Sequence, residues 1–316
     1  DQRLDIDLSI GACSFPETSQ DLDTIIRSAE SALSIAKRKK EHFDIATSAV
    51  EPDDDIHLSL LGELRSALNE DQFRLHYQPK FDLKTRELKS VEALVRWQHP
   101  IQGQVRPDLF IPFAEKTGFI KQITPWVIHQ ALRDASQWFA KGLDFSVSVN
   151  VSAIDLNNPD LIPTINQALT TFPIPAEKLC LEVTESALMD DPKASFERLK
   201  ALSELGIRLS MDDYGTGQAS LAYVRDLPID ELKIDRSFIT DIDSNTKNAA
   251  IVSSTLFLCG ELGISVVAEG VETDKELLWL QQHNCDLVQG YRISRPLIFA
   301  ELLEWQPDEK LCALGY

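Results

Sequence analysis

From residue 72 onward the sequence alternates strand-like and helix-like segments, and this alternation restricts the fold more than any other feature of the chain. Eight runs rich in apolar and β-branched residues read as strands: "FRLHYQPKFDL", "LKSVEALVRW", "FSVSVNVS", "LCLEVTES", "IRLSMDD", "ELKIDRSF", "SVVAEGVE" and "DLVQGYRI". Helical or mixed segments separate most of these runs. Eight such units over about 240 residues predict a closed α/β barrel of the TIM type.

The first two strand-like runs are joined by only four residues, "KTRE". A link of this length suits a hairpin and is far too short for a parallel crossover. We therefore predict an α/β fold with a TIM-like (β/α)8 barrel in which one strand is antiparallel to its neighbours.

The first part of the chain has a different pattern. Residues 4–15 alternate like a half-buried strand, residues 21–40 form an amphipathic helical pattern with a basic end, and a polar, acidic stretch follows. One strand and one helix cannot bury a core alone. We expect residues 1–45 to be a short α+β remnant of a truncated domain, 46–56 a linker and 57–316 the barrel. Since the chain does not begin with Met, we expect it to be a piece of a longer protein.

The net charge and the cysteines of the chain indicate which binding partners and which cell compartment suit it. The 50 acidic and 31 basic residues give a net charge of −19, which argues against broad binding to nucleic-acid polymers or anionic membranes. Five cysteines, odd in number and without CxxC spacing, indicate reduced thiols and a cytoplasmic protein; membrane anchoring of the parent through upstream regions stays open. The apolar stretch 249–268 is interrupted by Glu261 and two glycines, and we expect a helix, a turn and a strand there.

Polar residues recur late in the strand-like runs, every 20 to 34 residues from Asn150 onward: Glu92, Asn150, Glu182, Asp212 with Asp213, Lys233 and Asp235, Glu269, and Gln289. The carboxyl ends of barrel strands converge on one mouth, so these side chains should meet there. Converging carboxylates need cations, and ligands that are all oxygen favour Mg²⁺ or Mn²⁺ over zinc. Adjacent aspartates suit a pair of ions that catalyse a phosphoryl displacement.

Several of these residues also have ordinary structural interpretations. Asn150 could cap the following helix, Gly215 and Gly217 could be simple turn residues, and Lys233 could be an ion-pair partner of Asp235. Arg96, next to Trp97, could serve packing or a cation–π contact.

Eight motifs in order resemble the EAL family of cyclic di-GMP phosphodiesterases: "YQP" (77–79), "EALVRW" (92–97), "NVS" (150–152), "LEVTES" (181–186), "MDDYGTG" (211–217), "LKIDRSF" (232–238), "VVAEGVET" (266–273) and "VQGY" (288–291). The resemblance covers residues 57 to about 305. It implies hydrolysis of cyclic di-GMP to linear pGpG with two Mg²⁺ or Mn²⁺ ions.

The resemblance also implies roles for individual residues. The first metal ion would be held by four side chains, those of Glu92, Asn150, Glu182 and Asp212. Asp212 would also bridge to the second ion, which Asp213 would bind. The candidate catalytic residues are Glu92, Lys233 and Glu269: in the family the lysine contacts the attacking water, and the glutamate corresponding to Glu269 is a base or a ligand of the second metal.

Further positions match motif residues around the substrate. Gln78 and Arg96 correspond to residues that touch it, with Arg96 on a phosphate. Three residues are expected to support the metal shell or a guanine, namely Asp235, Glu272 and Gln289. Glu185 resembles the residue that anchors the loop "DDYGTG".

Residues 4–40 resemble the C-terminal end of a GGDEF domain, so an upstream sensor or GGDEF domain is expected in the parent chain; a homodimer is left open. The main alternative is a catalytically silent cyclic di-GMP receptor of the same fold. An enolase-type lyase would need an N-terminal capping domain that residues 1–56 do not resemble. A purely interacting scaffold leaves the converging carboxylates unexplained.

Overall fold

The computed structural model describes residues 10–16, 25–26, 28–29, 32–33, 36, 43–46, 52–215, 221–308 and 311. The chain divides into two compact units, residues 1–72 and 73–316. Each unit is described by itself.

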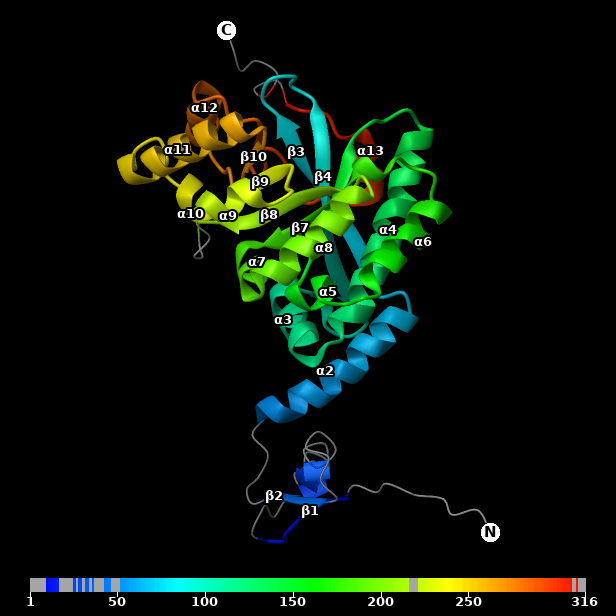
Figure 1. Ribbon diagram of the computed structural model, residues 1–316. Coiled ribbons are helices and arrows are strands. Elements are labelled where there is room, and N and C mark those ends of the chain that lie inside the picture. The colour runs from blue at the N-terminus through cyan, green and yellow to red at the C-terminus, as the bar shows by residue number, and fades with distance from the viewer. Residues whose placement is uncertain are drawn as a thin grey trace. The chain divides into compact units, whose positions relative to one another are not determined.

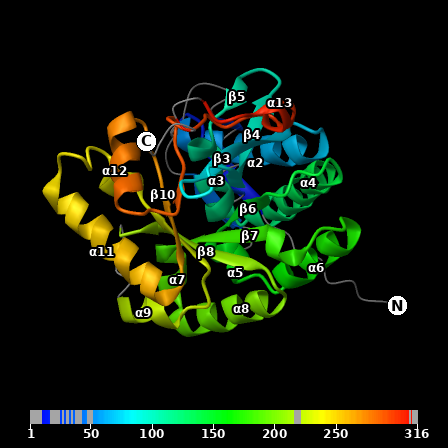
Figure 2. The same cartoon turned by 90° about the horizontal axis from the view of Figure 1, so that it is seen from above.

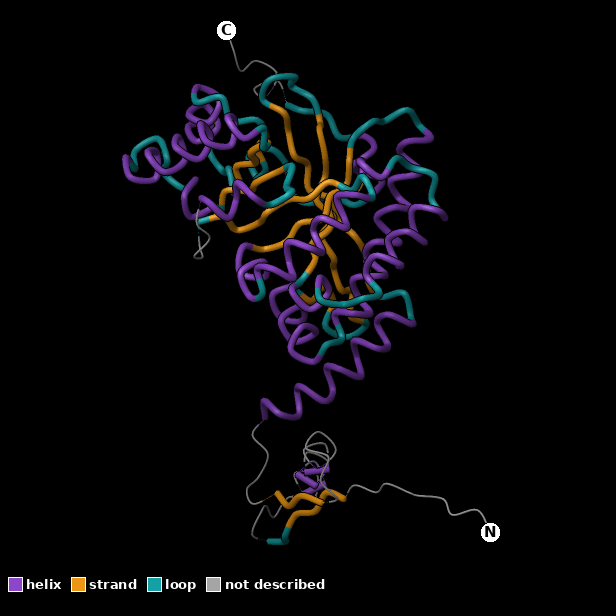
Figure 3. Tube along the Cα trace, viewed as in Figure 1, coloured by secondary structure: helices purple, strands orange, loops and turns teal. Residues whose placement is uncertain are grey.

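The second unit is a closed barrel of eight strands, as the sequence predicts (Figures 1 and 3). The strands are β3 (Phe73–Asp82), β4 (Leu88–His99), β6 (Ser146–Val151), β7 (Leu179–Thr184), β8 (Arg208–Tyr214), β9 (Glu231–Ile234), β10 (Ser265–Ala268) and β11 (Leu287–Val288). Around the barrel they follow the order β3-β11-β10-β9-β8-β7-β6-β4, and pairing of β3 with β4 closes the ring. A short strand, β5 (Gly103–Val105), extends β4 outside the ring.

The reversed strand is β3, which runs antiparallel to both β4 and β11, whereas the other neighbours in the ring are parallel. The side chain of Asp82 accepts hydrogen bonds from the backbone N–H groups of Lys84 (2.8 Å) and Thr85 (2.9 Å). Arg86 completes the turn with a φ of +60°. These local bonds form the tight hairpin that the four-residue link predicts.

Helices lie around the outside of the strands (Figure 2). They are α3 (Pro107–Thr117), α4 (Ile120–Ala140), α5 (Ala153–Leu156), α6 (Leu161–Thr171), α7 (Glu185–Asp190), α8 (Pro192–Glu204), α9 (Leu221–Asp226), α10 (Arg236–Ile239), α11 (Thr246–Leu262), α12 (Asp274–Gln282) and α13 (Phe299–Glu304), with a 3-10 turn, η1, at Ala176–Lys178. The apolar stretch 249–268 is indeed a helix, a turn at Gly263 and strand β10. None of the helices in the described ranges is long and apolar enough to cross a membrane.

Strand β11 has only two residues, fewer than the run "DLVQGYRI" predicts. Gly290 lies two residues after its end, with a φ of +156° and its backbone close to that of Val271. A Cβ on Gly290 would lie 2.2 Å from the Val271 carbonyl oxygen. Glycine is therefore required where the segment after β11 crosses the segment after β10.

In the first unit, β1 (Ile10–Cys13) pairs in parallel with β2 (Phe43–Ala46), and the described residues between 25 and 36 are helical. The polar stretch after that helix thus contains a strand. The segment expected to be a linker, 46–56, begins with the last residue of β2 and ends inside helix α2 (Pro52–Asn69). Proline suits the first turn of a helix, where its missing N–H costs nothing. The boundaries proposed at residues 45 and 56 stay predictions.

Cysteines in the described part of the chain are free thiols, as predicted: Cys13, Cys180, Cys259 and Cys285. Cys312 lies outside the described residues. Burial raises the pKa of the Cys285 thiol to about 12, so this group is a protonated, unreactive part of the core.

Candidate active site

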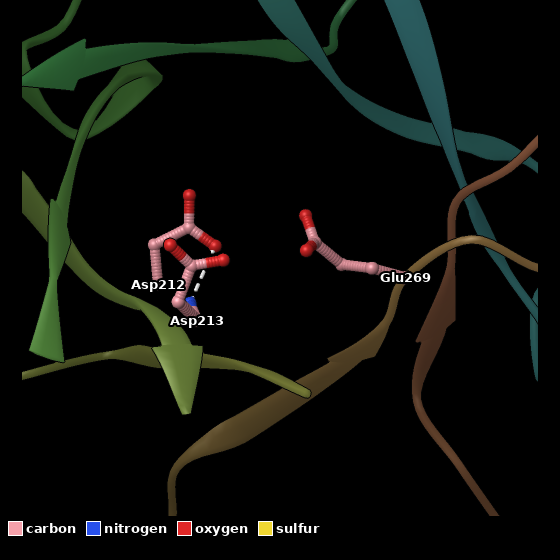
Figure 4. Close-up of side chains that lie close together, drawn as sticks. All are labelled: Asp212, Asp213 and Glu269. Atoms are coloured by element: carbon pink, nitrogen blue, oxygen red, sulfur yellow. Dashed lines mark hydrogen bonds between the residues drawn. The ribbon is translucent and has the colours of Figure 1, made fainter. Parts of the chain in front are cut away.

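Carboxylates from several strands meet at the carboxyl ends of the parallel strands. Asp212 and Asp213 lie near the end of β8, and Glu269 directly follows β10. Figure 4 shows the Glu269 carboxylate directed toward the two aspartates. Each of the three side chains offers an oxygen that lies within 4.8 Å of the others, an arrangement that could hold a metal ion.

The ammonium group of Lys233, on β9, lies at the centre of this cluster. Its Nζ is 2.6 Å from Glu182 Oε2, 2.6 Å from Glu269 Oε1, 3.1 Å from Asp212 Oδ2 and 3.5 Å from Glu92 Oε2. The Lys233 side chain is 1% exposed. Burial alone would lower its pKa, but the surrounding carboxylates raise the pKa well above its usual value, so the ammonium is charged.

Glu182, on β7, is held by two lysines. Its Oε2 accepts a hydrogen bond from Lys233, and its Oε1 accepts one of 2.6 Å from Lys80 on β3. Since β3 and β7 are not neighbours in the ring, the contact with Lys80 crosses the barrel interior. Burial would raise the pKa of Glu182, yet the two ammonium groups outweigh it and lower the pKa to about 2.

Glu92, on β4, is held by amide groups. Its Oε1 accepts a hydrogen bond of 2.7 Å from Asn150 Nδ2, and its Oε2 accepts one of 2.6 Å from Gln289 Nε2. The same Gln289 Nε2 lies 3.2 Å from Gln78 Oε1, and Gln78 in turn donates to the backbone oxygen of Ser294. Burial raises the pKa of Glu92, opposed by Lys233. Four of the candidate residues are thus connected by hydrogen bonds: Gln78, Glu92, Asn150 and Gln289.

The two adjacent aspartates differ in conformation and surroundings. Asp212 is buried, and its side chain faces Lys233. Asp213 is half-buried, has a φ of +56°, and donates its backbone N–H to Asp212 Oδ1 at 2.8 Å. Burial and then the charge of Asp212 raise the pKa of Asp213. The pairing of β8 with β9 is irregular between Met211 and Tyr214, so both side chains can reach the barrel mouth.

The end of β8 is fastened by Glu185, the first residue of α7. Its buried carboxylate accepts a hydrogen bond of 3.0 Å from the N–H of Gly215. The contact agrees with the anchoring role expected for Glu185. Gly217, together with the rest of 216–220, lies outside the described residues.

Two candidate residues have other local partners. Asp235 is the N-cap of α10 and accepts a hydrogen bond of 3.0 Å from the N–H of Ser237, although its charge still raises the pKa of Asp213. It does not pair with Lys233 among the ion pairs of the described residues, contrary to the structural interpretation raised above. Glu272 forms an exposed ion pair with Arg236, with 3.1 Å between Oε1 and Nη2.

Arg96, near the end of β4, lines a cavity of about 630 Å³. Asn150, Thr184 and the α3 residue Ile111 are among the other residues of its wall. Nη1 of Arg96 donates to the backbone oxygen of Val95. Burial lowers the pKa of Arg96, but the usual pKa of a guanidinium is so high that the group keeps its positive charge beside the acidic cluster.

Sequence reasoning missed two buried charged residues, Lys80 and Glu231. Nζ of Lys80 lies 2.7 Å from Glu231 Oε1, and both side chains are buried. The signal available was alternation along β3: Lys80 follows Gln78 by two residues, so both face the same side of the strand.

The donor set fits a divalent cation. Its members offer oxygen atoms and come from β4, β7, β8 and the residue after β10: Glu92, Glu182, Asp212, Asp213 and Glu269. These five carboxylates outnumber the two neighbouring ammonium groups, those of Lys80 and Lys233. Mg²⁺ and Mn²⁺ prefer such ligands.

Comparison with known proteins identifies families and solved structures that are similar to this barrel. The model of the family described as "EAL domain" matches residues 61–296. The cyclic di-GMP phosphodiesterase NbdA of Pseudomonas aeruginosa is 40% identical over 301 residues, which cover 94% of this chain and 38% of that protein. The bifunctional diguanylate cyclase/cyclic di-GMP phosphodiesterase MucR of the same organism is 38% identical over 300 residues, 94% of this chain and 44% of that protein. The chain thus spans less than half of the length of these relatives.

A solved structure titled "PaMucR Phosphodiesterase, c-di-GMP complex" superposes with a TM-score of 0.74 at 42% sequence identity, covering 77% of this chain and 99% of that one. The structure of the EAL enzyme Bd1971 with cAMP and cyclic di-GMP bound gives a TM-score of 0.73 at 33% identity, covering 78% and 68%. The family match covers more than half of the chain, and the barrel agrees with that of the solved relatives. The chain belongs to the EAL-domain family.

Proposed function

We propose that this chain hydrolyses cyclic di-GMP to linear pGpG, using two divalent ions, Mg²⁺ or Mn²⁺, bound at the acidic cluster. The observation that carries the proposal is the convergence of four carboxylates on Lys233 at the carboxyl ends of the barrel strands. Relatives named as cyclic di-GMP phosphodiesterases support the choice of substrate.

The ions would be held by Glu92, Asn150, Glu182, Asp212 and Asp213. Bound divalent ions supply positive charge for the phosphoryl oxygens and make water a better nucleophile. The hydrogen bonds that Asn150 and Gln289 donate to Glu92 fix the direction of that carboxylate. Such outer contacts hold a ligand in the geometry that an ion requires.

The proton of the attacking water would pass to the carboxylate of Glu269. Burial, opposed by Lys233, raises the pKa of Glu269 to about 8, so its ionised carboxylate is a stronger base than that of an exposed glutamate and would take up the proton. Lys233 contacts Glu269 at 2.6 Å and would orient the water by donating a hydrogen bond to it.

Substrate would lie across the mouth with a phosphate near Arg96. The cavity beside Arg96 and Asn150, about 630 Å³, is within the range of pockets that accept drug-sized ligands, and its walls are largely apolar. This suits a flat base, while Gln78 and Arg96 supply polar contacts.

We further propose that residues 1–45 are the end of a GGDEF domain of a longer cytoplasmic protein, with 46–56 as the connection to the barrel. The match to MucR, whose name includes diguanylate cyclase, covers 94% of this chain and so extends ahead of residue 61. The β–α–β order of the first unit is compatible with such an origin. Association as a homodimer belongs to the same proposal.

The test is incubation of the purified chain with cyclic di-GMP and Mg²⁺, Mn²⁺, Ca²⁺ or EDTA, with separation of the products. We expect pGpG with Mg²⁺ or Mn²⁺ and none with EDTA. Ca²⁺ should block the reaction, because it prefers longer bonds and looser coordination. Binding of cyclic di-GMP without turnover under all conditions would instead identify a silent receptor.

A further inference from the structure

Two lysine ammonium groups lie inside the barrel, and they differ in their surroundings. Lys80 lies deep in the interior, where its Nζ is 2.6 Å from Glu182, 2.7 Å from Glu231 and 3.0 Å from Ser148 Oγ. Its partners lie on β6, β7 and β9, and of these only Glu182 also contacts Lys233.

Lys233 has partners of another kind. Apart from Glu182, it contacts three further carboxylates of the acidic cluster: Glu269 at 2.6 Å, Asp212 at 3.1 Å and Glu92 at 3.5 Å. Asp212 and Glu269 are also two of the three residues whose oxygens come within 4.8 Å of one another. The ammonium and a metal ion would thus use the same two carboxylates.

Two cations that share these carboxylates would lie close together and repel each other. Mg²⁺ binds oxygen at about 2.0–2.1 Å, and the ammonium lies 3.1 Å from Asp212 Oδ2 and 2.6 Å from Glu269 Oε1. Positive charges only a few ångströms apart in a buried site repel strongly, because the effective dielectric constant there is far below that of water.

We propose that Lys233 is the resident counter-cation of the acidic cluster and competes with divalent ions for Asp212 and Glu269, while Lys80 stays with Glu182. The inference rests on the proposed metal-dependent function. In metal-free protein the ammonium prevents the repulsion of converging carboxylates, and Lys80 keeps Glu182 in place when that ammonium shifts. The affinity of the acidic cluster for divalent ions is therefore lower than it would be without the Lys233 ammonium.

The experiment is calorimetric titration of the whole chain with Mn²⁺ alone, without nucleotide. The variants are Lys233→Met, Lys233→Gln and the matched control Lys80→Met, which also removes one buried ammonium next to Glu182. Both Lys233 variants should bind Mn²⁺ about tenfold more tightly or better, and Lys80→Met should stay within about threefold of wild type. Lys233→Gln can still donate hydrogen bonds to the carboxylates, which protects the fold.

Thermal unfolding gives a second readout. The Lys233 variants should unfold at a lower temperature than wild type in EDTA and gain more from added Mn²⁺. Equal or weaker Mn²⁺ binding by both Lys233 variants, or an equal gain in Lys80→Met, overturns the inference while leaving hydrolysis by wild type intact. Absence of Mn²⁺ binding in wild type and variants alike overturns the proposed function as well.

Discussion

The carboxylate of Glu185 accepts a hydrogen bond from the backbone N–H of Gly215 at 3.0 Å. Glu185 begins α7, and Gly215 directly follows the strand that carries Asp212 and Asp213. At Gly215 the backbone has a φ of +99°, and a Cβ would meet the Phe238 ring at 2.7 Å. The bond therefore ties the end of β8 to the neighbouring helix.

Replacing Glu185 by Ala should release this end of β8. We expect turnover of cyclic di-GMP to fall about 10- to 100-fold, because small displacements of catalytic groups have effects of this size. Hydrogen exchange at the Gly215 amide should accelerate. Glu204→Ala, at the exposed end of α8, is the matched control and should change neither. Wild-type turnover in Glu185→Ala would show that the anchor is dispensable.

Gly290→Ala should destabilise the barrel. A Cβ there would lie 2.2 Å from the Val271 carbonyl oxygen, at a φ of +156°. We expect a loss of about 2–4 kcal/mol in the free energy of unfolding, measured by urea denaturation. Gly260, inside α11 with nothing within 4 Å of an added Cβ, is the control, and Gly260→Ala should be neutral or stabilising by about 0.5–1 kcal/mol. Equal effects of the two changes would contradict the close crossing.

The stability of the metal-free protein should depend on pH through Glu269. Its pKa is raised to about 8 by burial, opposed by Lys233, from a usual value of 4.5. A raised pKa means that the folded state favours the protonated carboxyl, so this stabilisation is complete below pH 4.5 and is lost as the pH rises through about 8. In EDTA, the wild type should lose about 1–3 kcal/mol over this range relative to Glu269→Gln. A parallel decline in both proteins would show that Glu269 is not responsible.

Much of this fold could be predicted from the sequence because its signals are local. Strand runs, helical faces and the four-residue hairpin link each show in a short window, and strand-end acids repeat with the strand–helix unit. The contacts of Lys80 could not be predicted, because its partners Glu182 and Glu231 lie 102 and 151 residues away and meet it only across the closed barrel. Strand β2 was missed for a related reason: its partner β1 is distant in the sequence, and its four residues lie within a polar stretch.

Asp212 and Asp213 should not be equivalent. Asp212 is buried and contacts Lys233, whereas Asp213 is half-buried with a left-handed backbone. As the proposed bridge, Asp212 changed to Asn should weaken the binding of both ions. Asp213→Asn should leave one ion bound and still abolish turnover. Anomalous scattering from crystals grown with Mn²⁺ counts the ions, and two full ions with normal turnover in Asp213→Asn would contradict this assignment.

Hydrolysis of cyclic di-GMP is proposed to take place at the acidic cluster of the barrel mouth. Glu92 is 6% exposed and bound by Asn150 and Gln289, and it joins the cluster through Lys233. The most direct measurement is the turnover number of Glu92→Ala at saturating Mg²⁺, with circular dichroism to confirm the fold. We expect a loss of about a thousandfold or more with the fold retained, because an ion ligand is removed. Turnover close to that of the wild type would show that the cluster is not the active site.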